Sequence, residues 1–363
     1  MMVILIAKGG IGIFGPLVFC FFLSLALTPI VKKLALKTGA VDFPNHRKVH
    51  SNIMPRLGGI AIFFSFVCGL IVYRPNVFFI VPFLMGSSLI VLTGLLDDFF
   101  QLPARLKLIG EIVSTFPLIF GGMAIDFIMI PFTGPVYFGL FSIPVTIIWI
   151  VGITNAINLI DGLDGLAAGV SAIAIMTITF IAFQKGNMLT VTIGLLAIGS
   201  IAGFLIYNFH PAKIFMGDSG ALFLGYLIAV LSLMGFKSVT FFSYIIPIII
   251  LGVPLSDTIF AIIRRIVHKQ PIAVADKSHL HHVLLKRGFT HRQAVLAIYM
   301  MAAMFGVIAI IFSQATVWGA ILIIAIVLLF LELLAEFTGI ISKDYRPLLK
   351  MVKNLEAKNK MTS

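Results

Sequence analysis

Two adjacent carboxylates, Asp97 and Asp98, end a long apolar stretch of this sequence. Ionisable side chains at the edge of such a stretch are costly to bury, and they usually mark functional positions. Neighbouring carboxylates also repel each other, so the pKa of one is expected to rise unless a cation lies between them. The pair therefore suits a general base or a metal site. The alternative is the solvated start of a loop.

A second polar segment carries Asn158, Asp161 and Asp164, each three residues from the next. In a helix these side chains would lie along one face. Glycines at 162 and 165 would let the backbone turn or approach a ligand closely. A capped helix start would explain only one of the acids.

A third segment supplies Asn208, Phe215 and Asp218 just before another apolar run. Asp218 suits a hard cation, because Mg²⁺ prefers oxygen ligands and often takes only one or two carboxylates. The competing interpretation makes Asp218 or Ser219 the N-cap of the following helix. Phe215 could stack on a base or fill space at the membrane interface.

Histidines gather in the most basic internal segment, at His279, His281 and His282. The spacing would fit zinc, but no cysteine accompanies it and the surroundings are cationic. Hydrogen bonds to phosphate oxygens fit better. The alternative is an ordinary surface loop.

A further basic group precedes the second apolar stretch. It contains Arg47, Lys48, His50 and Arg56. Membrane topology alone could explain these charges. The histidine and the paired glycines 58 and 59 favour phosphate contacts.

The composition indicates a membrane protein. Hydrophobic residues make up 60% of the chain and charged residues 11%, against about 25% charged residues in soluble domains. The bilayer must therefore act as solvent for most of the chain. The net charge of +12 is better explained by topology and anionic headgroups than by nucleic acid.

We predict an all-α polytopic membrane protein with about eleven transmembrane helices. The predicted spans are 11–31, 57–73, 77–96, 106–124, 141–157, 163–183, 188–206, 219–235, 241–262, 293–313 and 316–338. Residues 125–140, centred on Thr133, predict a short extracytoplasmic β-hairpin. The expected domains are an integral membrane unit, 1–341, and a basic cytoplasmic tail, 342–363.

The basic residues predict the orientation of these spans. With the N-terminus outside, only Lys8, Arg74, Lys185 and Lys237 of the 26 Lys and Arg residues fall on the outer side. Two crossings separate each polar cluster from the next, so every cluster returns to the cytoplasmic face. Residues spread over the sequence can then form one site at that face.

Taken together, the motifs resemble those of the polyprenyl-phosphate N-acetylhexosamine-1-phosphate transferase family. They are Leu96-Asp97-Asp98, Asn158-Leu-Ile-Asp161-Gly-Leu-Asp164-Gly, Phe215-Met-Gly217-Asp218-Ser-Gly and His279-Leu-His281-His282. Their order and spacing match over roughly residues 11–315.

The resemblance implies transfer of a sugar 1-phosphate from a UDP-sugar to a polyprenyl phosphate, with Mg²⁺ or alternatively Mn²⁺. It implies Asp218 as the metal ligand, with Asp161 and Asp98 as further candidates, and Asp97 as the base supported by Asp98. It implies nucleotide and metal-site roles for Asn158, Asp161 and Asp164. Asn208 and Phe215 resemble uracil-pocket groups, the three histidines resemble pyrophosphate contacts, and Lys107 resembles a basic residue beside the catalytic acids.

The His-Leu-His-His pattern resembles the N-acetylglucosamine-1-phosphate branch of the family. The expected partners are UDP-N-acetylglucosamine, undecaprenyl phosphate and membrane lipid, with a homodimer allowed. The expected location is a bacterial plasma membrane, where the product would start teichoic acid, O-antigen or a similar glycan. UDP-muramoyl-pentapeptide as donor and a covalent phospho-enzyme remain alternatives. A secondary transporter is the alternative from another class, although the acids lie at span ends and no repeat is visible.

Overall fold

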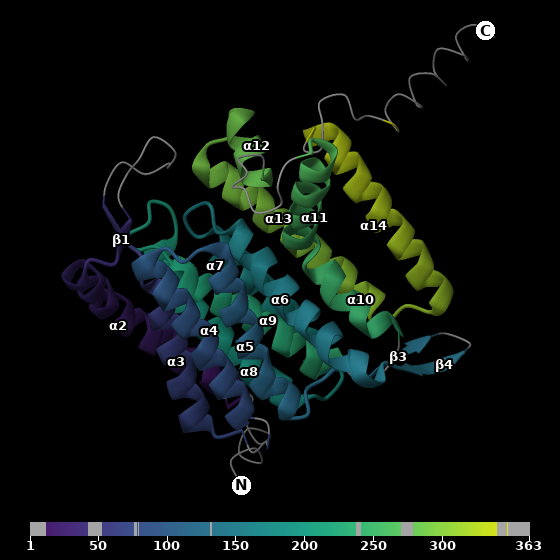
Figure 1. Cartoon of the computed structure of the whole chain (residues 1–363), viewed down its shortest axis with the longest axis horizontal. Helices are drawn as coiled ribbons and strands as arrows, with labels where there is room; N and C mark the ends of the chain where they lie inside the picture. The colour runs from purple at the N-terminus through teal and green to yellow at the C-terminus, as the bar shows by residue number, and fades with distance from the viewer. Residues whose placement is uncertain are drawn as a thin grey trace, which may run out of the picture.

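The computed structural model describes residues 12–42, 53–75, 78, 80–130, 133–236, 241–269, 279–339 and 347. Arg47, Lys48 and His50 lie outside the described residues, as does the predicted tail apart from residue 347. The described chain is mainly helical (Figure 1), which confirms the predicted fold class.

The helices follow one another with short connections. They are α2 (Gly15–Thr38), α3 (Gly58–Tyr73), α4 (Ile80–Phe100), α5 (Ala104–Phe120), α6 (Ser142–Ile160), α7 (Leu166–Gln184), α8 (Met188–Asn208), α9 (Gly217–Phe236), α10 (Phe241–Ile250), α11 (Gly252–Val267), α12 (Leu280–Lys286), α13 (His291–Phe312) and α14 (Val317–Thr338). A short 3-10 turn, η1 (Gly139–Phe141), leads into α6.

Every predicted span overlaps a helix or the bent pair α10 and α11, with bounds that differ by up to seven residues, as at the end of α2. Eight of the described helices are long and apolar enough to cross a membrane, and the bent pair, which turns by 81°, raises the number to nine. The remaining two are shorter: α3 has 16 residues and α5 has 17, against about 20 for a typical span. The chain is a multi-pass membrane protein, and the count of eleven stays a prediction.

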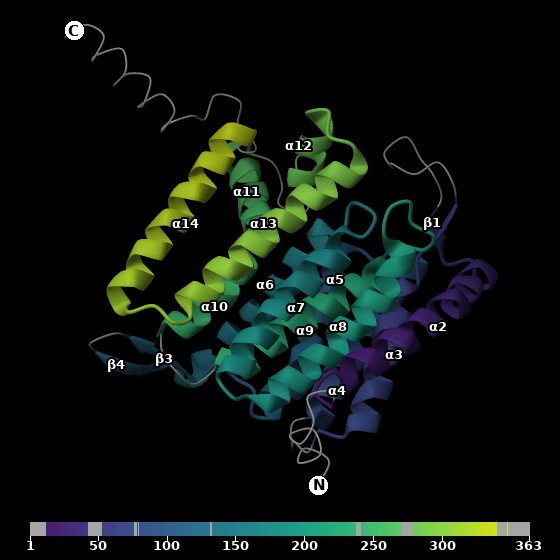
Figure 2. The ribbon, with the colours of Figure 1, turned by 180° about the vertical axis from the view of Figure 1, so that it is seen from behind.

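Helix α9 lies at the centre of the bundle (Figures 1 and 2), where it contacts α3, α4, α6 and α7. Its most apolar stretch is 89% buried inside the protein, whereas that of α14 is only 11% buried. A helix that is apolar on all sides can be enclosed by other helices. The start of α9 is therefore the point around which the other helix ends are arranged.

Glycines let α3 and α4 approach the first turn of α9 at backbone distance. A Cβ added to Gly59 would lie 2.1 Å from the backbone nitrogen of Gly220. A Cβ added to Gly94 would lie 2.4 Å from the Cα of Ser219. Small residues at helix contacts are typical of membrane bundles, because packing drives association there.

Two small antiparallel sheets flank the helices. Strands β3 (Phe127–Ile130) and β4 (Gly134–Tyr137) pair with Phe127 opposite Tyr137, which confirms the predicted hairpin. Strands β1 (Val41–Asp42) and β2 (Met54–Pro55) form a second pair that the sequence did not predict. Figure 1 shows β1 and the β3–β4 hairpin on different sides of the molecule.

We expect Gly59→Ala to destabilise the protein by about 1–3 kcal/mol, because the new methyl group meets backbone atoms that cannot move aside. Thermal unfolding of detergent-solubilised protein measures this effect. Gly152→Ala is the matched control, since no atom lies within 4 Å of its added Cβ. Equal melting temperatures for the two variants would contradict the close packing of α3 on α9.

Candidate functional site

Polar side chains from five parts of the chain meet at one end of the bundle. They are Arg56 before α3, Asp97 and Asp98 at the end of α4, Lys107 on α5, Asn158 and Asp161 at the end of α6, and Asp218 at the start of α9. The expectation that an even number of crossings returns these groups to one face is consistent with this arrangement. Side-chain contacts show how closely they are joined.

Asp218 lies at the centre of the cluster. Its Oδ1 accepts hydrogen bonds from Lys107 Nζ at 2.5 Å and Asn158 Nδ2 at 2.7 Å. Its Oδ2 accepts one from Arg56 at 3.0 Å. The carboxylate is therefore held by two cations and an amide in the first turn of the most enclosed helix.

Lys107 joins three helices through one ammonium group. Besides Asp218, its Nζ donates to Asp97 Oδ2 and to Asn158 Oδ1, both at 3.0 Å. Oxygen atoms from α4, α6 and α9 thus converge on one positive charge. Such a set of oxygen donors is also what a hard divalent cation requires.

Asp98 has a different role from its neighbour Asp97. Its side chain is fully buried, and it accepts backbone hydrogen bonds from Asp218 at 2.8 Å and Ser219 at 3.1 Å. These N–H groups belong to the first turn of α9, where intrahelical partners are lacking. Asp98 therefore caps α9 from another helix, and the capping role considered for Asp218 or Ser219 falls to Asp98.

The segment before α3 runs beside the segment before α9. Phe215 donates its backbone N–H to Pro55, and Gly58 donates to the carbonyl of Phe215 at 3.0 Å. Gly217 adopts a φ of 75°, and a Cβ there would lie 2.0 Å from the carbonyl oxygen of Arg56. This pairing places the Arg56 guanidinium among acids, 3.4 Å from Asp98 and 3.7 Å from Asp42.

Asp161 is the open carboxylate of the cluster. Helix α6 ends at Ile160, so Asn158, Asp161 and Asp164 do not form the polar stripe that one continuous helix would give. The Asp161 side chain is exposed and makes no hydrogen bond or ion pair within the described part of the chain. Surrounding protein and, next, the Asp218 carboxylate raise its pKa to about 7.

The charge balance of the cluster fits a divalent cation. Five carboxylates, at 42, 97, 98, 161 and 218, surround the two described cations Arg56 and Lys107. A nearby positive ion would favour the ionised form of Asp161. Asp218, Asp161 and the amide oxygen of Asn158 offer oxygen atoms of the kind that Mg²⁺ prefers.

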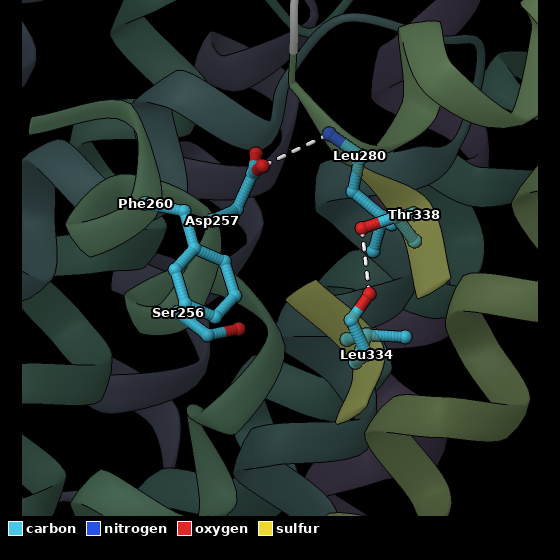
Figure 3. A pocket seen from close by; sticks show the side chains of 6 residues that line it. All are labelled: Ser256, Asp257, Phe260, Leu280, Leu334 and Thr338. Carbon is cyan, nitrogen blue, oxygen red and sulfur yellow. Dashed lines mark hydrogen bonds between the residues drawn. The ribbon is translucent and has the colours of Figure 1, made fainter. Parts of the chain in front are cut away.

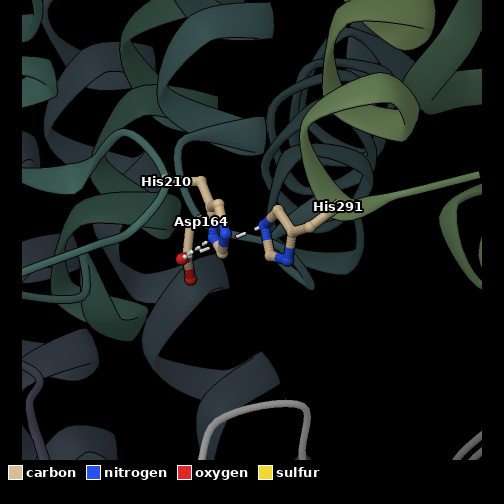
Figure 4. Close-up of side chains that lie close together, drawn as sticks. All are labelled: Asp164, His210 and His291. Carbon is tan, nitrogen blue, oxygen red and sulfur yellow. Dashed lines mark hydrogen bonds and ion pairs between the residues drawn. The ribbon is translucent and has the colours of Figure 1, made fainter.

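Asp164 belongs to a separate group (Figure 4). Its Oδ2 lies 2.8 Å from His210 Nδ1 and 4.0 Å from His291 Nε2, and it accepts the backbone N–H of Ala212 at 3.1 Å. The two imidazole rings stack with centroids 4.1 Å apart. One ligand atom from each residue lies within 4.8 Å of the others, but nitrogen ligands suit zinc better than magnesium.

The histidine segment packs against the Asp161 loop. A Cβ added to Gly162 would lie 2.3 Å from His281 Nε2, so only glycine fits there. Burial lowers the pKa of His281 to about 3, and this histidine is neutral at physiological pH. The ring of His282 lies 4.2 Å from that of His281.

The expected uracil-pocket residues shape the neighbouring loop. Asn208 is buried, and its side-chain amide donates to the carbonyl of Ile214 at 3.0 Å. Phe215 is partly exposed. The 208–215 loop is thus held at both ends, by Asn208 and by the backbone pairing of Phe215.

Two buried acids of this region were missed in the sequence. Glu111 bonds the amide of Asn155, and Asp257 bonds His279 and the backbone of Leu280. Glu111 lies one helical turn after Lys107, and Asp257 interrupts an apolar run. Both positions are signals that could have revealed them.

Comparison with known proteins places the site in context. The model of "Glycosyl transferase family 4" matches residues 80–236. A Bacillus subtilis protein named probable undecaprenyl-phosphate N-acetylglucosaminyl 1-phosphate transferase is 48% identical over 92% of this chain and 94% of its own length. Decaprenyl-phosphate N-acetylglucosaminephosphotransferase of Mycolicibacterium smegmatis is 33% identical over 84% of each chain. Undecaprenyl-phosphate alpha-N-acetylglucosaminyl 1-phosphate transferase of Yersinia pestis is 27% identical over 83% of this chain and 84% of its own.

We expect Asp98→Ala to lower the stability by about 1–2 kcal/mol, because it leaves two N–H groups at the start of α9 without acceptors. Asp161→Ala should leave stability unchanged or slightly higher, since it removes a carboxylate without a described partner. Thermal unfolding in detergent with a chelator present measures both. A larger loss for Asp161→Ala would contradict the capping role of Asp98.

Proposed function

The chain belongs to glycosyl transferase family 4, and from this we propose that it transfers N-acetylglucosamine 1-phosphate from UDP-N-acetylglucosamine to undecaprenyl phosphate. The products are undecaprenyl-diphospho-N-acetylglucosamine and UMP, and the lipid product starts an envelope glycan. The observation that carries the proposal is the convergence of Asp97, Asn158 and Asp218 on Lys107, beside the open Asp161. Phosphoryl transfer needs such positioning and charge neutralisation more than covalent help.

The proposed location is the cytoplasmic face of a bacterial plasma membrane. The distribution of Lys and Arg supports this orientation. A UDP-sugar would arrive from the cytosol, while the lipid phosphate would arrive sideways through the bilayer. The described cluster lies where helices end, which gives both substrates access to the same groups.

Asp218 and Asp161, with the Asn158 amide oxygen, are the proposed ligands of Mg²⁺, and Mn²⁺ would suit the same oxygens. When bound, the ion would neutralise the diphosphate and stabilise the UMP leaving group. Asp98 is less suited to bind it, because its carboxylate is buried and already accepts two backbone N–H groups. Its proposed part is to hold Asp218 in place.

Asp97 is the proposed base. Its Oδ1 accepts the backbone N–H of Leu102 at 2.7 Å, so the carboxylate is fixed while its Oδ2 pairs with Lys107. In this proposal Asp97 takes a proton from the lipid phosphate, and a phosphate oxygen attacks the sugar-bearing phosphorus with departure of UMP. Lys107 and Arg56 hold positive charge beside the incoming anions.

The remaining residues are proposed to bind the nucleotide and diphosphate. Phe215, Asn208 and Asp164 shape the loop that would contact uracil. His279, His281 and His282 would offer N–H groups to the diphosphate oxygens, with His281 acting as a neutral donor. Arg47, Lys48 and His50 are also proposed to contact phosphate groups.

We expect purified protein in detergent to release UMP only when UDP-N-acetylglucosamine, undecaprenyl phosphate and a divalent cation are all present. UMP release can be followed by chromatography. Turnover of UDP-muramoyl-pentapeptide instead would overturn the proposed donor. Absence of turnover with either donor, from protein that unfolds cooperatively, would overturn the proposed activity.

Asp218→Asn should nearly abolish turnover, and Asp97→Asn should lower kcat by about 10²-fold or more. Titration of Mg²⁺ separates the two variants, since only the first should need far more metal. Near-normal rates for Asp218→Asn at limiting Mg²⁺ would refute its assignment as ligand.

Direct attack by the lipid phosphate predicts no exchange of labelled UMP into UDP-N-acetylglucosamine while lipid is absent. A covalent phospho-enzyme would allow that exchange. The exchange assay should use lipid-depleted protein, and the same preparation with undecaprenyl phosphate restored serves as the positive control.

A further inference from the structure

Asp257 lies on α11, the helix that follows the 81° bend, and its side chain is buried. Its two oxygens have separate partners. Oδ2 lies 2.9 Å from His279 Nδ1, and Oδ1 accepts the backbone N–H of Leu280 at 2.9 Å. Figure 3 shows the carboxylate pointing toward Leu280, with Ser256 and Phe260 beside it.

These contacts fix the start of α12. His279 is the residue before the helix, and Leu280 is its first residue. A ring that binds Asp257 through Nδ1 leaves Nε2 as the edge that can meet a ligand. The same first turn carries His281, which packs on Gly162 beside Asp161. Asp257 therefore connects α11 to the carboxylate cluster through the histidine segment.

A helix cap alone would not need this arrangement. One side-chain acceptor, from Ser, Thr or Asn, is enough to cap a helix. A buried carboxylate is costly unless its oxygens are hydrogen-bonded, and here one of them is bound to an imidazole. In metal sites, carboxylates behind histidines set the tautomer and orientation of the ring, and their loss costs about 10–100-fold in activity or affinity.

We propose that Asp257 is the positioning residue of the histidine segment: it accepts the Nδ1–H of His279 and stabilises the doubly protonated ring, so that Nε2–H is directed at the diphosphate of the nucleotide sugar and donates to it. This rests on the proposed function, in which His279 contacts that diphosphate. Asp257 itself touches no substrate. Its effect passes through His279, so the two residues act as one unit.

The test is a double-mutant cycle of Asp257→Asn, His279→Gln and the combined variant, with kcat and KM for UDP-N-acetylglucosamine measured in detergent. We expect Asp257→Asn to lower kcat/KM by about 10²-fold. Asn can accept from only one of the two donors, so His279 must change tautomer or lose its partner. In the His279→Gln background the same change should cost less than about 3-fold, because coupled residues are not additive.

The matched control is Thr258→Ala on the same helix, whose hydroxyl bonds only Pro254 of α11 in the described structure. It should behave as the wild type. Nitrogen NMR of labelled histidine adds a readout independent of turnover: the His279 signal, identified by its loss in His279→Gln, should show Nδ1 protonation that shifts in Asp257→Asn.

Additive losses in the cycle, or an unchanged His279 signal, would overturn the proposal and leave Asp257 as packing. Full activity of His279→Gln would instead overturn the role of His279 in the proposed function. If Asp257→Asn does not fold, Asp257→Ser keeps one acceptor for Leu280, and the same cycle is run with it. Additivity there counts equally against the proposal.

Discussion

The carboxylate of Asp98 accepts the first N–H groups of α9, and the geometry of the site depends on this bond. A charge with no exposed surface must be matched by donors, and the start of a helix offers them. Glycines 59 and 94 make the bond feasible, because they let α3 and α4 touch the backbone of α9. With α9 held in this way, Asp218 can be directed at Lys107 rather than at its own helix.

The rest of the cluster follows from the charges around Asp218. Lys107 and Arg56 each occupy one of its oxygens; Lys107 reaches it from α5 and Arg56 from the segment before α3. Asp161 adds a further carboxylate, which forms no ion pair in the described part of the chain. A cluster that is short of positive charge and rich in oxygen donors can take up a metal ion with a phosphorylated ligand, which together bring charges of both signs.

Much of this site could be predicted from the sequence, because acids that end apolar spans are rare and two crossings return the chain to its starting face. Asp97, Asp98, Asp161 and Asp218 were found on that basis. Which of these acids caps α9, which is the proposed base and which are proposed metal ligands could not be predicted. The partners of Asp98 lie 120 and 121 residues away, and nothing local distinguishes a cap from a base.

Other features were beyond sequence patterns for similar physical reasons. Helix α6 continues to Ile160, three residues beyond the predicted span end at 157, because neither a proline nor a glycine marks the boundary there. Helix α5 ends at Phe120, four residues before the predicted end of its span at 124, although the short α3 was predicted almost to the residue. The role of Asp257 can be recognised only from its contact with His279. This contact joins α11, which follows the 81° bend, to the start of α12.

The cap on α9 also bears on how the chain is made. Ribosomes synthesise α4 long before α9, so the acceptor for the α9 N-terminus is already in the bilayer when that helix enters. In a chain with the reverse order, water or headgroups would have to bind these N–H groups until α4 arrived. The order of synthesis thus lets the buried contact form as soon as α9 packs against α4.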